Sequence, residues 1–236
     1  MFSNAIDADA LRGQLARHRR AQVREVLQPD AAERLARCLE DEVPWRVAER
    51  AGGTPRHHAP EVLAADSPEY RGLLAAAHAQ AGTSFQFVYD SYMLVRAARE
   101  GWDRSLVLHV VLEFLNSPQF LAFARYITGD DGIVRADAQA TRYRPGQFLL
   151  PHSDENRGDD RRYAYVINLS RQWRADWGGL LQFLDARGEV EATFLPLWNS
   201  LSLFKVPAEH LVSLVAPWAA QPRLAITGWL MGPPRP

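Results

Sequence analysis

The sequence has only one cysteine in 236 residues and no long apolar run. Cys38 can form no disulfide within the chain, which fits a reducing compartment. The stretch SLVLHVVLEFL is interrupted by His109 and Glu113, so we expect no transmembrane helix. The first residues also lack the apolar centre of a signal peptide. These absences predict a cytoplasmic protein with no membrane partner.

An excess of charge of either sign is also missing. The chain has 27 basic and 28 acidic side chains, so its formal net charge is −1. This balance gives no reason to expect nucleic acid as a partner. The length suits a single domain that spans residues 1–236, and the composition leaves the oligomeric state open.

The first part of the chain, residues 1–134, is predicted to be a mainly helical support with one or two strands. Ser67-Pro68 and Ser117-Pro118 are typical helix starts, in which serine caps the helix and proline takes its first position. The segment SFQFVYD, residues 84–90, places aromatic side chains at alternate positions and indicates a strand.

The remainder, residues 135–231, contains eight short segments in which apolar and polar residues alternate. Glycine, proline, asparagine and aspartate separate these segments, so we expect antiparallel strands joined by turns. Many short strands at close spacing predict a jelly roll, also called a double-stranded β-helix. The predicted fold class is therefore α+β, with a jelly-roll core and a short tail at residues 232–236. The segments are AQATRYR, GQFLLPHS, YAYVINLS, GLLQFLD, EATFLPL, SLSLFKVP, HLVSLVAP and RLAITGWL.

Three side chains in this core form a candidate metal site. His152 and Asp154 are two positions apart, which places them on one face of a strand, and His210 begins a later strand. Either histidine taken alone is more often structural. Two imidazoles and one carboxylate, however, make the facial triad that leaves positions open on Fe(II). A structural zinc site would want four protein ligands, usually with cysteine among them.

An arginine at the start of the last strand completes the candidate site. Arg223 shares its strand face with Ala225 and Thr227. An inward arginine is costly unless an anion pairs with it, and its planar guanidinium suits a carboxylate. A 2-oxo acid that chelates the metal would need such a cation for its far carboxylate. The alternative is an arginine on an edge strand that reaches solvent.

Residues 117–230 resemble the Fe(II)- and 2-oxoglutarate-dependent dioxygenases of the prolyl-4-hydroxylase-like branch. The segments TRYRPGQFLLPHSDE, EHLVSLV and PRLAITGWL carry this resemblance, because His-x-Asp, a distant His and Arg-x-Ala-Ile-Thr follow in family order. The resemblance implies that His152, Asp154 and His210 are the catalytic iron ligands. It also implies that Arg223 binds the distal carboxylate of 2-oxoglutarate.

The resemblance assigns three further residues to the cosubstrate pocket. Tyr143 matches a tyrosine that lines this pocket, and Thr227 matches a position that supports the same carboxylate. Asn168 stands where close relatives often carry a tyrosine that hydrogen-bonds the cosubstrate. Because asparagine is shorter, either the pocket has shifted or Tyr165 or Tyr143 compensates.

The implied reaction is hydroxylation of an unactivated C–H bond, with release of succinate and CO2. It uses Fe(II), 2-oxoglutarate and O2, with ascorbate as a candidate stimulant. The carboxylate of Asp154 favours hydroxylation, because a chlorinating relative would need a small residue there. A prolyl or other peptidyl substrate is expected by analogy. Trp173 and Trp177 are expected either to flank the entrance or to cover an edge of the sandwich.

Three alternatives remain open at the level of sequence. The substrate could be a free amino acid or another biosynthetic small molecule instead of a peptide or protein. The chain could be a non-catalytic, cupin-like module that holds a metal or a small acid, although such a module would not need Arg223. A purely structural interaction protein that uses the helical half would bind no metal.

Overall fold

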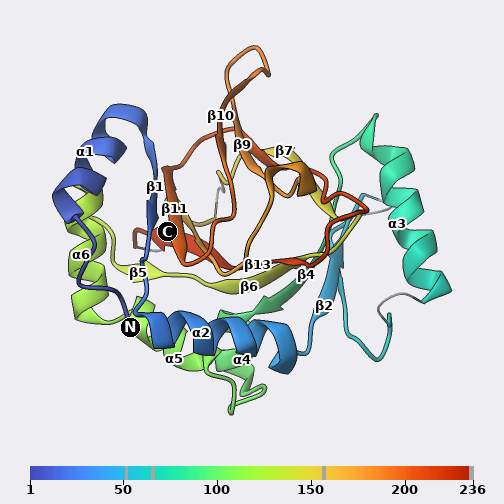
Figure 1. Cartoon of the computed structure of the whole chain (residues 1–236), viewed down its shortest axis with the longest axis horizontal. Coiled ribbons are helices and arrows are strands. Elements are labelled where there is room, and N and C mark those ends of the chain that lie inside the picture. Colours follow the sequence, from blue (N-terminus) through green and yellow to red (C-terminus); the bar gives the residue numbers. More distant parts are fainter. Residues whose placement is uncertain (51–52, 65–66, 156–157, 234–236) are drawn as a thin grey trace.

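The computed structural model of the chain describes residues 1–50, 53–64, 67–155 and 158–233 (Figure 1). Its helices fall mainly in the first half of the sequence, as predicted. None of the described helices is long and apolar enough to cross a membrane. The helices are α1 (Ala8–His18), α2 (Pro29–Arg37) with a π-helical turn at Cys38–Glu42, α3 (Pro68–Ala81), α4 (Leu94–Glu100), α5 (Leu108–Leu115) and α6 (Pro118–Thr128), and a short 3-10 turn follows at Ala175–Trp177.

The serine-proline pairs start helices as predicted. The side chain of Ser67 accepts a hydrogen bond from the Tyr70 amide at 3.0 Å, and Ser117 accepts one from the Phe120 amide at 3.2 Å. Each serine satisfies an amide that the first turn of a helix leaves unpaired. In Figure 1, α2, α4 and α5 lie below the sheet, and α3 lies to its right.

The strands form one continuous antiparallel sheet in the order β1-β11-β8-β13-β6-β4-β7-β12-β9-β10. The sheet curls, so that β7, β9 and β10 lie opposite β6 and β13 (Figure 1), and side chains of β6, β7, β9 and β13 line a cavity between them. This is the predicted double-stranded β-helix, and all eight predicted segments contain strands. The strands are β1 (Arg20–Arg24), β2 (Arg46–Glu49), β3 (Arg56–His58), β4 (Phe87–Met93), β5 (Arg135–Ala136), β6 (Gln139–Tyr143), β7 (Phe148–His152), β8 (Arg161–Asn168), β9 (Leu181–Leu184), β10 (Val190–Phe194), β11 (Ser200–Lys205), β12 (His210–Val212) and β13 (Arg223–Met231).

Alternation along β13 separates the apolar core from the interior of the β-helix. Leu224 and Ile226 belong to the large core cluster, which also contains buried residues of the helices, such as Leu35 of α2. Removing such side chains from water contributes roughly 1.5–3 kcal/mol each. Arg223 and Thr227 have the opposite parity and face inward, as their shared strand face predicted. The helical layer thus holds one face of the sheet and leaves the other face for the site.

The first half of the chain contributes more strands than the one or two expected. Its described residues include β1, β2, β3 and β4. The segment RAQVR of β1 alternates polar and apolar residues over only five positions, which is a weak signal for a strand, and only its Ala21 is buried. Its backbone nevertheless pairs with β11 from Arg20↔Phe204 to Arg24↔Ser200. The first half therefore completes the sheet. The interpretation of residues 1–236 as one domain stays a prediction. Of the predicted tail, residues 234–236 lie outside the described residues.

Candidate active site

Three potential ligand side chains converge inside the β-helix. His152 ends β7 and pairs directly with His210 at the start of β12, so their ring centroids lie 4.2 Å apart. Asp154 follows β7 in a loop, not in the strand itself. Its Oδ1 lies 3.7 Å from Nε2 of His152, and its Oδ2 lies 3.6 Å from Nε2 of His210. The ligand atoms of all three residues lie within 4.8 Å of one another.

Backbone hydrogen bonds orient both imidazoles toward this common point. Nδ1 of His152 contacts the carbonyl oxygen of Leu150 at 3.0 Å, and Nδ1 of His210 contacts that of Ala208 at 2.9 Å. When Nδ1 carries the proton and donates it, Nε2 is left with a free lone pair, the form that binds metals. Burial, together with the nearby His152, lowers the pKa of His210 to about 4. His210 is therefore neutral and ready to coordinate at physiological pH.

This donor set fits a divalent iron ion. Two imidazoles and a carboxylate from one side of a cavity leave the remaining coordination positions open to small ligands. Asp154 is buried, and Arg161 donates to its backbone oxygen at 3.4 Å. Among the described residues no hydrogen-bond donor engages its carboxylate, so both oxygens can serve a ligand between the histidines.

The same cavity contains a buried cation. Arg223 is 3% exposed, and its Nε and Nη1 atoms have no hydrogen-bond partner among the described residues. Its guanidinium lies 5.2 Å from the ring centroid of Tyr143, a cation–π contact that offsets part of the desolvation. Burial lowers the pKa of Arg223. An unpaired buried arginine is unfavourable by itself, so its free donors mark a place for an anion.

An aromatic wall supports the arginine. Tyr143 of β6 stacks on Tyr89 of β4, with ring centroids 5.2 Å apart and planes 23° apart. Burial raises the pKa of Tyr89 to about 12, so this wall stays neutral. Thr227 also lines the cavity, and its role toward a carboxylate stays a prediction. It lies four residues along β13 from Arg223, roughly 13 Å by strand rise, so both could hold one carboxylate only if the long arginine leans toward it.

Asn168 occupies a different position. Its side chain is buried, donates to the hydroxyls of Ser200 and Ser202 at 3.2 and 3.4 Å, and does not line the cavity. Its Oδ1 has no partner among the described residues. The side-chain amide of Asn168 thus leaves only its oxygen, Oδ1, without a partner. Because an oxygen accepts hydrogen bonds and cannot donate them, it is a poor partner for a carboxylate. Tyr143 and Tyr165 both line the cavity, but the hydroxyl of Tyr165 donates to the carbonyl oxygen of Asp137 at 2.7 Å.

Sequence reasoning missed two residues that line the cavity from β8 and from the far end of β13. Arg161 of β8 lies with its guanidinium 3.7 Å from the ring centroid of Trp229 on β13. Nε of Arg161 and Nε1 of Trp229 are buried and lack partners among the described residues. Strand parity could have found Trp229, because it lies two positions beyond Thr227 on the same face. Phe85 and Phe87, from the predicted aromatic strand, line the cavity too.

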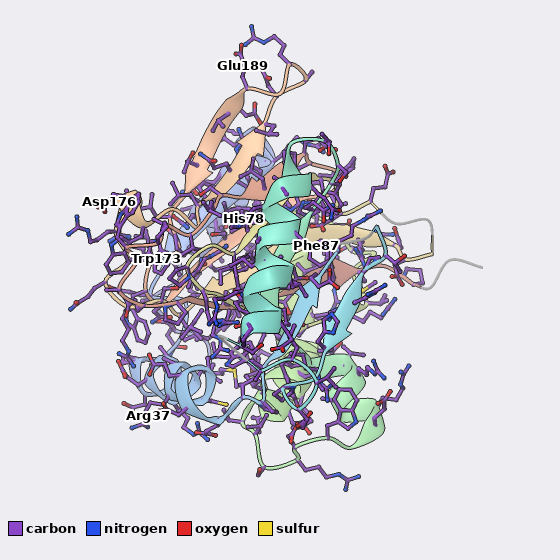
Figure 2. All side chains as sticks on the ribbon, turned by 90° about the vertical axis from the view of Figure 1, so that its right-hand side faces the viewer. Arg37, His78, Phe87, Trp173, Asp176 and Glu189 are labelled. Carbon is purple, nitrogen blue, oxygen red and sulfur yellow. The ribbon has the colours of Figure 1, made fainter. Side chains whose placement is uncertain are left out.

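Trp173 and Trp177 do not line this cavity. Trp173 is buried in an apolar cluster with Tyr143 and Val215, and Trp177 packs against the same cluster. A Cβ atom added to Gly179 would lie 3.2 Å from Trp173 and 3.4 Å from Cδ of Arg223. In Figure 2, Trp173 and Phe87 lie on opposite sides of α3. The tryptophans therefore cover an edge of the sandwich behind Arg223, which was one of the two expectations.

Comparison with known proteins shows what the jelly-roll core is similar to. The family profile of the 2OG-Fe(II) oxygenase superfamily matches residues 138–231. Residues 138–231 are therefore similar to that superfamily, whose name states its iron and its cosubstrate. Mouse prolyl 3-hydroxylase OGFOD1 is 32% identical over 121 residues, which are 48% of this chain and 22% of the mouse protein. The chain thus spans about a fifth of the length of this curated relative.

Solved structures extend the likeness to nearly the whole fold. A Pseudomonas putida prolyl-4-hydroxylase matches with a TM-score of 0.57 and 20% identity, covering 95% of this chain and 98% of that one. A Trichoplax adhaerens prolyl hydroxylase, solved with a peptide fragment of the hypoxia inducible factor oxygen degradation domain, gives 0.62 and 14% identity, covering 95% and 89%. At these identities the two structures show that the chain shares their fold.

Proposed function

We propose that this chain is an Fe(II)- and 2-oxoglutarate-dependent dioxygenase that hydroxylates a proline in a polypeptide. One observation carries the proposal: a cavity in which a two-histidine, one-carboxylate cluster shares its walls with a buried, unpaired arginine. A dicarboxylic 2-oxo acid matches this pair of features. One end of it can chelate a metal held by His152, Asp154 and His210, while its far carboxylate meets the guanidinium of Arg223.

The residues around the metal cluster and Arg223 have different tasks in this proposal. The backbone carbonyls of Leu150 and Ala208 hold the Nδ1 protons of the two histidines, so that both Nε2 atoms face the ion. Arg223 provides a fixed planar fork for a carboxylate, and Tyr143 supports that fork from below. The aromatic wall excludes water from the same space, which strengthens the charge pairing.

The bound metal, O2 and 2-oxoglutarate together supply the oxidation, in which one oxygen atom enters the substrate and the other enters succinate as CO2 leaves. The chain itself places the substrate. Arg161 and Trp229 present buried donors to the cavity from the wall that β8 and β13 form. We propose that both residues donate hydrogen bonds to the substrate backbone beside the reacting carbon, where one carbonyl oxygen can accept from both.

Proline is the substrate that the relatives suggest. The mouse relative carries the name of a prolyl 3-hydroxylase, and both structural relatives are prolyl hydroxylases. The structural likeness supports the fold alone, and loops around a site set its specificity. The single cysteine, which is reduced and buried, supports a cytoplasmic location for this activity.

The test begins without oxygen. Fe(II) and 2-oxoglutarate are titrated together, oxygen is then admitted, and succinate is measured with and without proline-containing peptides. We expect the visible band of the iron–2-oxoglutarate chelate, slow succinate formation alone, and faster formation with a peptide that gains one oxygen atom. Faster turnover only with free amino acids would establish the small-molecule alternative. A chain that binds both ligands but forms no succinate would be a binding module.

A further inference from the structure

The face of β4 and β6 that points away from the cavity carries a buried cluster of charges. Asp90 of β4 is 1% exposed and lies at its centre. Its Oδ2 accepts from Nε of Arg142 and from Nε of Arg144, both at 2.8 Å. Its Oδ1 accepts from Nε2 of Gln147 at 3.0 Å and from Nη2 of Arg144 at 3.3 Å. Four donors from three residues thus converge on one carboxylate.

The partners of Asp90 are fixed in turn. The guanidinium of Arg142 lies 5.0 Å from the ring of Trp45, and that of Arg144 lies 4.3 Å from the ring of Tyr70. Gln147 accepts from the backbone amide of Arg144 at 2.7 Å, which ties the turn after β6 to the same carboxylate. Charge-assisted bonds of this kind are short and geometrically specific. The cluster therefore sets the register and the path of β4 and β6.

Strand alternation transmits this order to the cavity face. Asp90 pairs in register with Arg142, so Tyr89 and Tyr143, their neighbours along the two strands, point together to the opposite face. These are the two stacked rings beneath the guanidinium of Arg223. Tyr143 lies in sequence between the two arginines that Asp90 binds. A shift of either strand would therefore move the ring that supports Arg223.

The turn after β6 adds a second connection at the same end of the cavity. Gly146 donates from its amide to the carbonyl oxygen of Val215 at 2.8 Å, and the Val215 amide donates to that of Gln147 at 3.0 Å. Val215 packs in the apolar cluster that contains Tyr143 and Trp173. Gln147 thus links Asp90 to the residues packed behind Arg223, and not only to the strands.

We propose that Asp90 is a positioning residue for the cosubstrate end of the site. This role rests on the proposed function, in which Arg223 binds the far carboxylate of 2-oxoglutarate. Asp90 touches neither ligand. It acts through Tyr143, by holding the stacked tyrosines under the guanidinium. Its loss should weaken 2-oxoglutarate binding and leave the affinity for the metal unchanged, because the triad lies on β7, β12 and the loop after β7.

The experiment measures two dissociation constants by calorimetry, that of Mn(II) and that of 2-oxoglutarate at saturating Mn(II). Asp90→Asn keeps the size of the side chain but removes the charge that orders two arginines. We expect the 2-oxoglutarate dissociation constant to rise on the order of tenfold or more, since small displacements of positioning groups have effects of this size. The Mn(II) constant should stay within about twofold, because the variant changes neither the three ligands nor the backbone carbonyls that orient the two histidines.

Tyr92→Phe is the matched control. Tyr92 is two residues further along the same face of β4, is buried, and donates to Asp103 at 2.9 Å. Its hydroxyl can be removed without disturbing Asp90 or Tyr143. This variant should lose some thermal stability and bind 2-oxoglutarate like the wild type. A general loosening of β4 would instead weaken 2-oxoglutarate binding in both variants, which would contradict the inference.

The remaining outcomes separate the inference from the function on which it rests. A wild-type chain that binds no 2-oxoglutarate would refute the proposed function. A wild type that binds it and an Asp90→Asn variant that binds it equally well would refute the role of Asp90 alone. If Asp90→Asn does not fold, Arg142→Gln replaces it, because Arg144 still pairs with Asp90. We then expect a smaller, several-fold rise in the 2-oxoglutarate constant, and no rise would overturn the proposal.

Discussion

The two faces of the sheet around β4, β6 and β13 differ in whether their buried charges have hydrogen-bond partners. On the face that points away from the cavity, the carboxylate of Asp90 accepts four hydrogen bonds. On the cavity face, Arg223 is as deeply buried but leaves Nε and Nη1 without partners among the described residues. A satisfied buried charge fixes structure, whereas an unsatisfied one is costly and marks where a ligand belongs.

The same contrast extends along the cavity face itself. Nε of Arg161 and Nε1 of Trp229 are likewise buried beside the cavity and have no partner in the part of the chain that the structure describes. Asn168, whose amide donors have partners, lies outside the cavity. If open donors mark ligand positions, then removing them should weaken binding, and removing residues whose donors are paired should affect stability instead.

The largest effect is expected at the metal cluster. His152→Ala and His210→Ala should each abolish measurable iron binding and turnover while the far-ultraviolet circular dichroism stays unchanged. Two remaining ligands hold the ion poorly, and the fold does not depend on it. Iron content after anaerobic loading and desalting checks this. Wild-type iron stoichiometry in either variant would exclude that histidine as a ligand.

Arg161→Met should give a smaller effect than the loss of a metal ligand, and on a different constant. Losing a hydrogen bond from a charged donor costs about 1.5–3 kcal/mol, so KM for the peptide substrate should rise roughly tenfold to a hundredfold. Trp229→Phe keeps the ring and loses one neutral donor, so the rise should stay below about tenfold. The dissociation constant of 2-oxoglutarate should change little in both. An effect on 2-oxoglutarate instead of the peptide would show that this wall serves the cosubstrate.

The smallest effect on binding is expected at Asn168. Asn168→Ala should leave the dissociation constant of 2-oxoglutarate within about twofold of wild type, because its amide does not reach the cavity. The hydroxyls of Ser200 and Ser202 lose their buried partner, so unfolding free energy should fall by about 1–3 kcal/mol. Urea denaturation and calorimetry measure the two quantities. A tenfold loss of 2-oxoglutarate affinity at unchanged stability would restore Asn168 to the pocket.

Much of the cavity face could be predicted because strand parity is a local property. The alternation in PRLAITGWL placed Arg223 and Thr227 inward, and the fold has them there. His210 was predicted to begin a strand, and it pairs directly with His152. Asp154 reached the cluster by another route, since it lies in the loop after β7 and not within the strand.

The rest depended on contacts between distant segments. Tyr89 came from a predicted strand, but only its pairing through β6 shows that it stacks on Tyr143. Nothing local in RAQVR indicated that β1 would pair with β11. The order of the charges around Asp90 could not be predicted, because Arg142, Arg144 and Gln147 meet it only after β4 and β6 have paired.

The measurement that tests the central claim most directly is the 2-oxoglutarate dissociation constant of Arg223→Ala at saturating Fe(II) without oxygen. Truncating one partner of a buried charge pair costs roughly 2–5 kcal/mol, so the constant should rise about 30-fold to several thousand-fold. Iron should still bind, and Arg223→Lys should recover only part of the affinity, because lysine lacks the planar fork. An alanine variant that binds 2-oxoglutarate within about twofold of wild type would contradict the account, because the unpaired arginine would then not be the carboxylate site.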